Sequence, residues 1–456
     1  MREKTDLKLT AGRAKADRIS VISSKSYVHR LLIGAFLCDE KPEVITNTVS
    51  DDMEATKRAL AGLAAPVPVP AQTPSPGASA NFIDGYPHRL PDHKDDRAID
   101  CGESGSTARF ILPLAAALTD GVTLTGSGKL PERPMGPLCD ALRAAGVSVS
   151  SDNLPITVKG KPKAGDYEIP GNVSSQFITG LLFMLPLLSG DSHLHITGKL
   201  ESAAYVDMTL DVLSRFGITV DRCEDGYKIK GPQKYRYTGG DKIEAEGDWS
   251  NGAYLMAIAS LGSGRAFEEF TVEGLKSDSI QGDRAVVDVL SQFGVSVERR
   301  SCDDGVFSGY TVSGRPLKAV DINCQQIPDL VPALSVLAAY AKGNSTFRNV
   351  ERLRIKECDR VDAISRMLGA VDVKVDIISH EGHEDMVIFG KGTTGQLKND
   401  IVIDSFNDHR IAMAAAALAF AENAPVIIKD AMAVNKSYPG FYELIEKMGI
   451  ASCRLH

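Results

Sequence analysis

The chain has 456 residues, 43% of them hydrophobic and 24% charged, which is typical of a folded protein with a sizeable apolar core. Its 59 acidic residues outnumber its 51 basic ones and give a net charge of −8. That balance argues against a general nucleic-acid-binding protein, which would carry a basic excess. No apolar run approaches the roughly 18 residues of a membrane span, so we expect no membrane association.

The start of the chain and its cysteines favour a cytoplasmic protein. The first 20 residues, MREKTDLKLTAGRAKADRIS, lack the apolar stretch of a signal peptide. The eight cysteines are scattered, without CxxC pairs or Cys/His ligand spacing. In a chain of this length, such spacing favours reduced thiols over disulfides and predicts no metal site.

Six segments share one plan, a polar or small-residue start followed by a mostly apolar stretch. Their starts are 80, 69, 75, 79 and 80 residues apart. Because each segment is apolar on nearly every side, we predict six buried helices. They are KSYVHRLLIGAFL from Lys25, GSTARFILPLAAAL from Gly105, SSQFITGLLFMLPLL from Ser174, WSNGAYLMAIASL from Trp249, PDLVPALSVLAAY from Pro328 and DHRIAMAAAALAF from Asp408.

A more amphipathic helix follows each buried one and ends at or near a glycine, the usual residue just past a helix end. Short alternating runs such as VTLTG, HLHITG and VIIKD predict strands between the helices. The chain is therefore predicted to contain six α/β repeats with the apolar helices inside. Two stretches are predicted to lie on the surface, the Pro-rich residues 66–96 as an extended excursion and HEGHED at 380–385 as a solvated loop.

Charged residues gather at the polar starts of the predicted buried helices and in the adjoining turns. Helix N-termini present unpaired N–H groups to anions. Cations are locally unfavourable at that end of a helix, so we interpret them as partners of bound anionic groups. The basic residues are Lys25, Arg30, Arg109, Arg133, Lys356, Arg360, Arg410 and Lys436, and the polar neighbours are Ser26, Ser106, Thr107, Ser174, Ser175 and Gln176.

The densest charged group is RIKECDR, residues 354–360. On a helix, Lys356 and Arg360 would be four positions apart and would share one face. A solvated helix face with ion pairs is the alternative interpretation of such a run. Taken singly, Asp329 suits a helix N-cap better than a reactive site, and Asp408 stands at a cap position.

Taken in order, these segments resemble the 5-enolpyruvylshikimate-3-phosphate synthase family, the 3-phosphoshikimate 1-carboxyvinyltransferases of the shikimate pathway. The likeness runs from about residue 20 to residue 440. Each motif is weak alone, but the ordered set is specific. It consists of SKSYVHR, GESGSTAR, ERPMG, SSQF, SAAY, EGD, QGD, IPD, RIKECDR, NDHR and KSYPG.

The resemblance implies a two-domain inside-out α/β barrel, in which each domain has three βαβαββ repeats with buried helices. Residues 1–22 plus 246–456 would form a discontinuous domain carrying Asp329, Glu357, Arg360, Arg410 and Lys436. Residues 23–245 would form an inserted domain carrying Lys25, Arg30, Arg133 and Ser174–Gln176. The active site would lie in the cleft between them, which closes on the substrates and excludes water.

The resemblance also implies the two small-molecule substrates and the residues that bind them. Bidentate arginines suit the carboxylate and phosphate groups that both substrates carry. Phosphoenolpyruvate would be held by Lys25, Gly105, Arg133, Gln176, Arg360, Arg410 and Lys436. Shikimate 3-phosphate would be held by Lys25, Ser26, Arg30, Ser174, Ser175, Gln176, Ser202, Tyr205, Asp329 and Lys356.

The implied reaction is an addition followed by an elimination. The 5-hydroxyl of shikimate 3-phosphate attacks C2 of phosphoenolpyruvate, and phosphate then leaves, on the route to chorismate and the aromatic amino acids. The expected catalytic residues are Asp329 as base at the hydroxyl, with Glu357 and Lys25 moving protons at C3 and at the leaving phosphate. We expect neither a metal nor an organic cofactor, no nucleic-acid or membrane partner, and a monomer.

The chain departs from the family pattern at several positions. His29 replaces a common asparagine and is expected to keep a hydrogen bond. Ala203 replaces a lysine. Arg352 stands where an asparagine often contacts the substrate, and Phe110 replaces a proline beside Arg109.

Two alternatives remain open. The enolpyruvyl transferases that act on UDP-N-acetylglucosamine share the fold, but they typically have a lysine-asparagine pair where this chain has Lys25-Ser26. They also carry a cysteine shortly before the arginine that matches Arg133, and residues 126–132 contain none. A non-catalytic anion-binding protein would keep the arginines without the carboxylates Asp329 and Glu357.

Overall fold

The computed structural model describes residues 5–64, 97–301, 308–314, 316–395, 397–422 and 424–455. The predicted Pro-rich excursion, residues 66–96, lies outside these ranges. By its internal contacts the chain divides into unit 1, Met1–Ser24 with Glu246–His456, and unit 2, Lys25–Ala245. Each unit has its own continuous apolar core.

Unit 2 has three mostly buried helices, each followed in the chain by an amphipathic one. The buried helices begin where the sequence predicted, although α5 gives way early to a 3-10 turn, η2, that contains Pro186. The helices are α1 (Lys25–Leu37), α2 (Asp51–Ala64), α3 (Gly105–Leu118), α4 (Gly136–Ala144), α5 (Ser175–Met184) and α6 (Ala203–Arg215), with the 3-10 turns η1 (Leu130–Glu132) and η2 (Leu185–Leu187).

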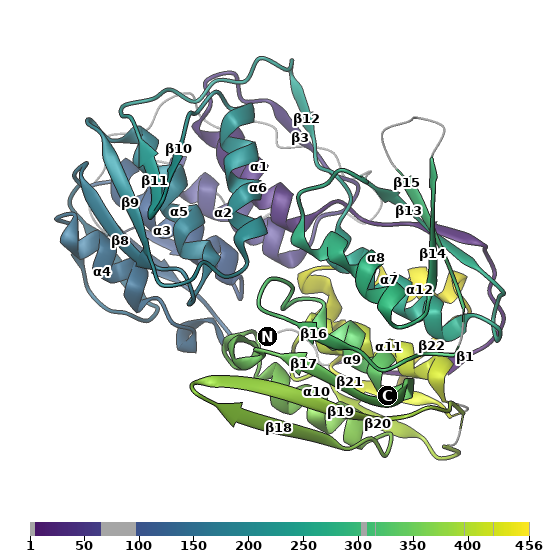
Figure 1. Ribbon diagram of the computed structural model, residues 1–456. Helices are drawn as coiled ribbons and strands as arrows, with labels where there is room; N and C mark the ends of the chain where they lie inside the picture. Colours follow the sequence, from purple (N-terminus) through teal and green to yellow (C-terminus); the bar gives the residue numbers. More distant parts are fainter. Residues whose placement is uncertain are drawn as a thin grey trace. The chain divides into compact units, whose positions relative to one another are not determined.

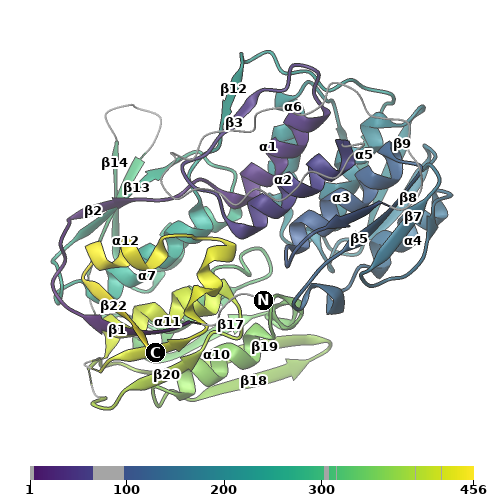
Figure 2. The same cartoon turned by 180° about the vertical axis from the view of Figure 1, so that it is seen from behind.

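The strands of unit 2 form two four-stranded sheets and one parallel pair. Figure 1 shows the sheet of β8 to β11 on the outer side of α3 and α5, and Figure 2 shows the same layers from behind. The sheet orders are β4-β5-β7-β6 and β10-β11-β9-β8, and β3 pairs with β12. The strands are β3 (Glu43–Ile45), β4 (Ala98–Asp100), β5 (Gly121–Thr125), β6 (Ser148–Val149), β7 (Ile156–Lys159), β8 (Asp166–Pro170), β9 (Ser192–Thr197), β10 (Asp221–Cys223), β11 (Gly226–Ile229) and β12 (Lys242–Glu244).

Unit 1 repeats this plan with helices that are buried along their whole length. Every residue of α7, α9 and α11 is buried, which confirms the prediction for these three segments. The helices are α7 (Trp249–Gly262), α8 (Val286–Gln292), α9 (Val331–Tyr340), α10 (Arg360–Gly369), α11 (His409–Ala421) and α12 (Phe441–Lys447), with the 3-10 helices η3 (Gly282–Ala285), η4 (Glu351–Ile355) and η5 (Ala431–Lys436).

Three four-stranded sheets complete unit 1. Their orders are β14-β15-β13-β2, β16-β17-β19-β18 and β20-β21-β1-β22. The strands are β1 (Asp6–Ala11), β2 (Arg18–Ser20), β13 (Phe270–Leu275), β14 (Ser296–Ser301), β15 (Ser308–Ser313), β16 (Asp321–Asn323), β17 (Lys342–Arg348), β18 (Val375–His380), β19 (His383–Lys391), β20 (Ile401–Asp404), β21 (Val426–Lys429) and β22 (Ile450–Leu455).

All five four-stranded sheets share one pattern of strand pairing. A strand pairs in parallel with the strand that follows the buried helix, and two antiparallel strands complete the sheet. The strands next to the unit boundaries pair within their own units: β2 of unit 1 precedes α1 in the chain but pairs with β13, whereas β12 of unit 2 precedes α7 but pairs with β3. The predicted α/β repeats are therefore confirmed, and closure of the repeats into a barrel stays a prediction.

Local turn chemistry overturns two of the sequence interpretations. RIKECDR is not one helix, because Lys356 is extended (φ −82°, ψ −155°) and Asp359 caps a new helix, α10, by accepting the Asp362 N–H at 3.1 Å. HEGHED is not a loop but a tight hairpin between β18 and β19, whose turn residues Glu381 and Gly382 have φ of +48° and +83°.

Within the described ranges, no helix is both long enough and apolar enough to cross a bilayer. The cytoplasmic location stays a prediction.

The closest approach of α3 and α5 depends on Gly180. A Cβ at this position would lie 2.3 Å from the Arg109 carbonyl oxygen. We expect Gly180→Ala to lower the free energy of unfolding by about 1–3 kcal/mol, because the helices must separate. In the control Gly369→Ala, where a Cβ meets nothing within 4 Å, the change should stay within about 0.5 kcal/mol. Equal stabilities of the two variants in urea unfolding would contradict this account of the packing.

Candidate functional site

In unit 2 a group of residues lies at the starts of the buried helices and on the segments next to them. It is here called the first polar cluster: Lys25, Asp52, Gly105, Arg109, Arg133 and Gln176. Lys25 Nζ contacts Asp52 Oδ2 at 2.9 Å. Arg109 donates to Gln176 Oε1 at 2.7 Å, and Gln176 Nε2 donates to Ser106 Oγ at 2.8 Å. The first turns of α3 and α5 are thereby joined by side chains.

Gly105 leaves room for the Arg133 guanidinium. A Cβ at residue 105 would lie 2.5 Å from Arg133 Nη1 and 2.9 Å from Arg133 Cζ. Arg133 follows the 3-10 turn η1 and is 8% exposed. The missing side chain therefore places a guanidinium directly at the N-terminus of α3, where helix N–H groups also favour an anion.

Arg30 is buried more deeply than Arg133, and its guanidinium donates to neutral oxygens. Its partners are Thr209 Oγ1 at 2.9 Å, the Tyr205 carbonyl at 2.9 Å, the Ser26 carbonyl at 2.7 Å and Thr179 Oγ1 at 3.3 Å. Burial lowers the pKa of Arg30 to about 10. With 2% exposure, Arg30 joins α1, α5 and α6, and its predicted contact with shikimate 3-phosphate stays a prediction.

The predicted serine and tyrosine ligands lie at helix starts. Ser174 caps α5, and its hydroxyl accepts the Gln176 N–H at 3.3 Å. Ser175 is buried in the first turn. Ser202 precedes α6 with a left-handed backbone (φ +54°) and no side-chain cap, and Tyr205 lies in the first turn of α6. A non-glycine residue in this conformation is strained, which is common at functional sites.

His29 keeps a hydrogen bond, as expected of a residue that replaces asparagine. Its Nδ1 lies 2.7 Å from Thr56 Oγ1, and a hydroxyl chain continues to Thr107 at 2.6 Å and Ser104 at 2.8 Å. Burial lowers the pKa of His29 well below its usual value, and nearby Lys25 adds to the effect. The ring is therefore a neutral part of the link between α1, α2 and α3.

Unit 1 contains a second polar cluster: Asp329, Lys356, Glu357, Arg360, Asp408 and Arg410. Arg360 lies at its centre with a 1% exposed side chain. It donates to Asp408 Oδ2 at 2.8 Å, Asp329 Oδ1 at 2.9 Å and Glu357 Oε2 at 2.7 Å. Burial alone would lower the pKa of Arg360, but Asp408, Glu357 and Asp329 together raise it well above its usual value.

Asp329 is contacted by two further cations. Arg410 Nη2 lies 3.5 Å and Lys356 Nζ 3.8 Å from its carboxylate oxygens, and the Tyr254 hydroxyl donates to its carbonyl at 3.1 Å. Burial lowers the pKa of Lys356 to about 8. The turn at Lys356, rather than a helix face, brings this lysine and Arg360 to the same aspartate.

Lys436 ends η5 and donates to the Asn407 carbonyl at 2.7 Å. Asn407 and Phe406 both have left-handed backbones, with φ of +55° and +52°. This turn presents the carbonyl to Lys436 and places Asp408 at the cap of α11, where it accepts the Arg410 N–H at 2.8 Å.

Sequence reasoning missed three carboxylates of the two clusters and their surroundings. Asp408 was interpreted only as an N-cap, yet it also binds Arg360. Asp52 gave no signal, because an aspartate at a helix start is ordinary. Asp283 lies in the QGD motif and is 2% exposed; it accepts from the Ser250 hydroxyl, and burial, with Asp329 nearby, raises its pKa to about 6.

Comparison with solved structures places this fold in one class. An EPSP synthase from Acinetobacter baumannii superposes with a TM-score of 0.72 at 22% identity, covering 99% of this chain and 100% of the other. The enolpyruvyl transferase NikO from Streptomyces tendae superposes with a TM-score of 0.70 at 14% identity, covering 99% of each chain. The fold is thus that of the enolpyruvyl transferases.

Sequence comparison identifies the family within this class. The family model "EPSP synthase (3-phosphoshikimate 1-carboxyvinyltransferase)" matches residues 10–445. The 3-phosphoshikimate 1-carboxyvinyltransferase of Clostridium kluyveri is 39% identical over 436 residues, 95% of each chain. That of Clostridium novyi is 37% identical over 437 residues, 94% of each chain. The chain belongs to the EPSP synthase family, whose members transfer an enolpyruvyl group from phosphoenolpyruvate to shikimate 3-phosphate.

The fit between Gly105 and Arg133 leads to a prediction. Gly105→Ala should displace the end of a flexible side chain and leave the melting temperature nearly unchanged. The KM for phosphoenolpyruvate should nevertheless rise about tenfold, the equivalent of roughly 1.4 kcal/mol of lost binding, because the guanidinium moves. An unchanged KM would show that Arg133 does not bind this substrate. Gly62→Ala, whose Cβ would meet Ile99 at 3.3 Å, is the control.

Proposed function

We propose that this chain carries out the family's reaction with residues of both polar clusters. Phosphoenolpyruvate and shikimate 3-phosphate each carry a carboxylate and a phosphate. The first polar cluster supplies cations for these groups, since Arg109 donates to a neutral amide oxygen and Arg133 lies at a helix N-terminus. The second polar cluster supplies the carboxylates that an addition and elimination needs.

The observation that carries the proposal is that Asp329 and Glu357 bind the same buried guanidinium. Arg360 holds their oxygens at 2.9 and 2.7 Å, so two proton-transfer groups have a fixed separation. Asp329 is proposed to take the proton of the 5-hydroxyl as its oxygen attacks C2 of phosphoenolpyruvate. Glu357, which is 23% exposed, is proposed to exchange protons at C3 in both steps.

Lys25 is proposed to act at the departing phosphate. It starts α1 and is 13% exposed, and its pairing with Asp52 holds the ammonium group at the helix N-terminus. A lysine in this position both attracts the phosphate and supplies a proton to it as the C–O bond breaks. Arg133, Arg410 and Lys436 are proposed as further phosphoenolpyruvate ligands.

A phosphate-release assay tests the choice of acceptor. We expect the chain to release phosphate from phosphoenolpyruvate with shikimate 3-phosphate and not with UDP-N-acetylglucosamine. Release with the nucleotide sugar alone would support the alternative transferase. Release with neither acceptor, from a folded protein, would support a non-catalytic anion-binding protein and contradict the proposal.

The two carboxylates are expected to matter for turnover more than for folding. Asp329→Asn and Glu357→Gln should each lower kcat by about 10²- to 10⁴-fold, the usual contribution of a positioned acid or base. Thermal unfolding monitors the fold of each variant. The control Asp376→Asn changes a carboxylate on β18 that pairs with Lys374, and it should leave kcat unchanged. Near-normal turnover in both test variants would refute the assigned roles.

The lowered pKa of Lys356 predicts a pH dependence. The ammonium form is present below pH about 8 and is lost as the pH rises through that value, so kcat/KM for shikimate 3-phosphate should fall above it. In Lys356→Arg the cation persists, because a guanidinium stays protonated, and the fall should move to higher pH. Superimposable pH profiles of the two proteins would exclude Lys356 as the titrating group.

A further inference from the structure

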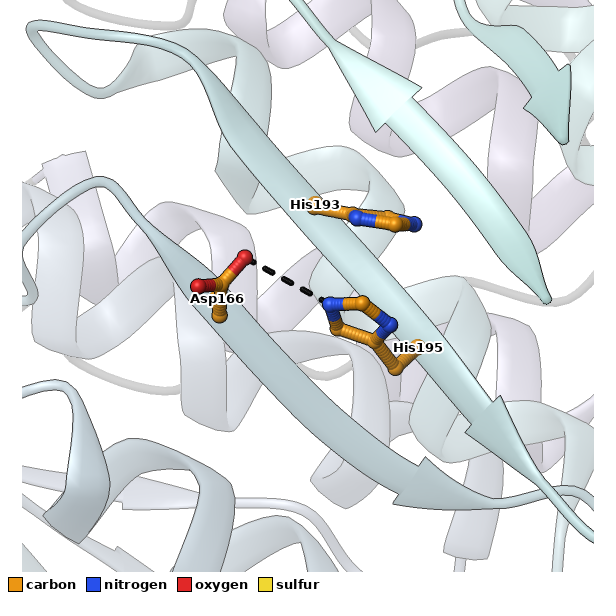
Figure 3. Close-up of side chains that lie close together, drawn as sticks. All are labelled: Asp166, His193 and His195. Carbon is orange, nitrogen blue, oxygen red and sulfur yellow. Dashed lines mark hydrogen bonds and ion pairs between the residues drawn. The ribbon is translucent and has the colours of Figure 1, made fainter.

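Histidine, cysteine and aspartate side chains, which are of the types that ligate metals in proteins, gather on the outer face of the β10-β11-β9-β8 sheet, and none of them belongs to either polar cluster. His193 and His195 are two residues apart on β9 and share this face, whereas Leu194 between them is fully buried in the core. Their ring centroids are 3.6 Å apart. Figure 3 shows Asp166, at the start of the neighbouring strand β8, directed towards the His195 ring, with Asp166 Oδ1 3.4 Å from His195 Nε2.

The hairpin of β10 and β11 adds a thiol and a second carboxylate. Cys223 Sγ lies 3.3 Å from His193 Nε2 and 3.3 Å from Asp225 Oδ1, and His193 Nε2 lies 3.1 Å from the same Asp225 oxygen. A tetrahedral Zn²⁺, with bonds of about 2.0–2.3 Å, separates its ligand atoms by roughly 3.3–3.6 Å. Outward shifts of a few tenths of an ångström would therefore admit the ion.

The backbone holds this hairpin close to β9. A Cβ at Gly226, where φ is +151°, would lie 2.0 Å from the Leu194 carbonyl oxygen, so only glycine permits the approach. The Asp225 carbonyl accepts the Ile196 N–H at 2.7 Å. Asp225 is thereby fixed over the two histidines rather than being free in a turn.

We propose that His193, Cys223 and Asp225 form a binding site for a divalent transition-metal ion such as Zn²⁺. Imidazole nitrogen, thiolate sulfur and carboxylate oxygen are the three donors that Zn²⁺ uses in proteins. Cys223 binds as the thiolate and releases its proton to solvent. The fourth position faces solvent, because Asp225 and His193 are partly exposed.

His195 acts as a positioning residue for this site. Its Nδ1 lies 2.7 Å from Asp225 Oδ2, whereas Cys223 contacts Asp225 Oδ1, and its other nitrogen approaches Asp166. A histidine that holds a ligating carboxylate in this way fixes the orientation of the ligand. The ion would fasten the β10–β11 hairpin to β9, at the end of the sheet opposite the start of α5.

Cobalt titration of the untagged, reduced full chain tests the site. We expect one equivalent of Co²⁺ to bind with the near-ultraviolet charge-transfer band of a cobalt thiolate, and Zn²⁺ to displace it. Cys223→Ser should abolish the band, and His193→Gln should weaken Co²⁺ binding at least about tenfold. His195→Gln should keep the band and weaken binding about 10- to 100-fold, as loss of an outer-sphere partner does.

Matched controls are Cys453→Ser and His383→Gln, which change an exposed cysteine and an exposed histidine of unit 1. Both should bind Co²⁺ like the unchanged chain. Enolpyruvyl transfer by all variants reports that they are folded. Absence of a thiolate band in the unchanged chain would overturn the proposal. A band that survives Cys223→Ser and is lost in Cys453→Ser would also overturn it. The cluster would then be a hydrogen-bonded surface network.

Discussion

A helix that is apolar on every side must be covered on every side, and this constraint organises the molecule. α7, α9 and α11 are buried along their whole length, so sheets and amphipathic helices have to surround them. The N-terminal ends of such helices are where unpaired N–H groups need polar partners. Polar side chains therefore collect at the helix starts, and both polar clusters are built there.

The two clusters use buried guanidinium groups in opposite ways. Arg30 donates to hydroxyl and carbonyl oxygens, and burial lowers its pKa to about 10. Arg360 is as deeply buried, but three carboxylates outweigh the effect of burial and raise its pKa. A buried charge is tolerated only when it is paired or well hydrogen-bonded. In unit 2 Arg30 thus donates to neutral oxygens, whereas in unit 1 Arg360 holds carboxylates in place.

Backbone turns with unusual geometry position several of these groups. The extended Lys356 and the cap at Asp359 turn RIKECDR back towards Asp329. The left-handed backbones of Ser202 and Asn407 turn the chain just before α6 and α11. A left-handed backbone at a non-glycine residue costs of order 1–3 kcal/mol and persists where the surrounding structure enforces it. The metal site proposed on β9 also depends on an unusual backbone conformation. Gly226 has a positive φ and lets the hairpin lie close enough to β9 for Asp225 to reach His193.

The sequence by itself determined the buried helices, because their composition leaves no solvent-facing side, and the six-fold spacing determined the α/β repeats. It also determined the family, since the ordered motifs are specific. Only the tertiary structure decided which carboxylate each cation contacts. In the sequence, Asp408 and Asp52 are ordinary aspartates at helix starts, whereas in the structure Asp408 pairs with Arg360 and Asp52 pairs with Lys25. The tertiary structure also decided that Lys356 and Arg360 converge through a turn and that Cys223 of β10 meets His193 of β9, although β11 lies between these strands in the sheet. Contacts of this kind join residues far apart in the chain, so no local pattern encodes them.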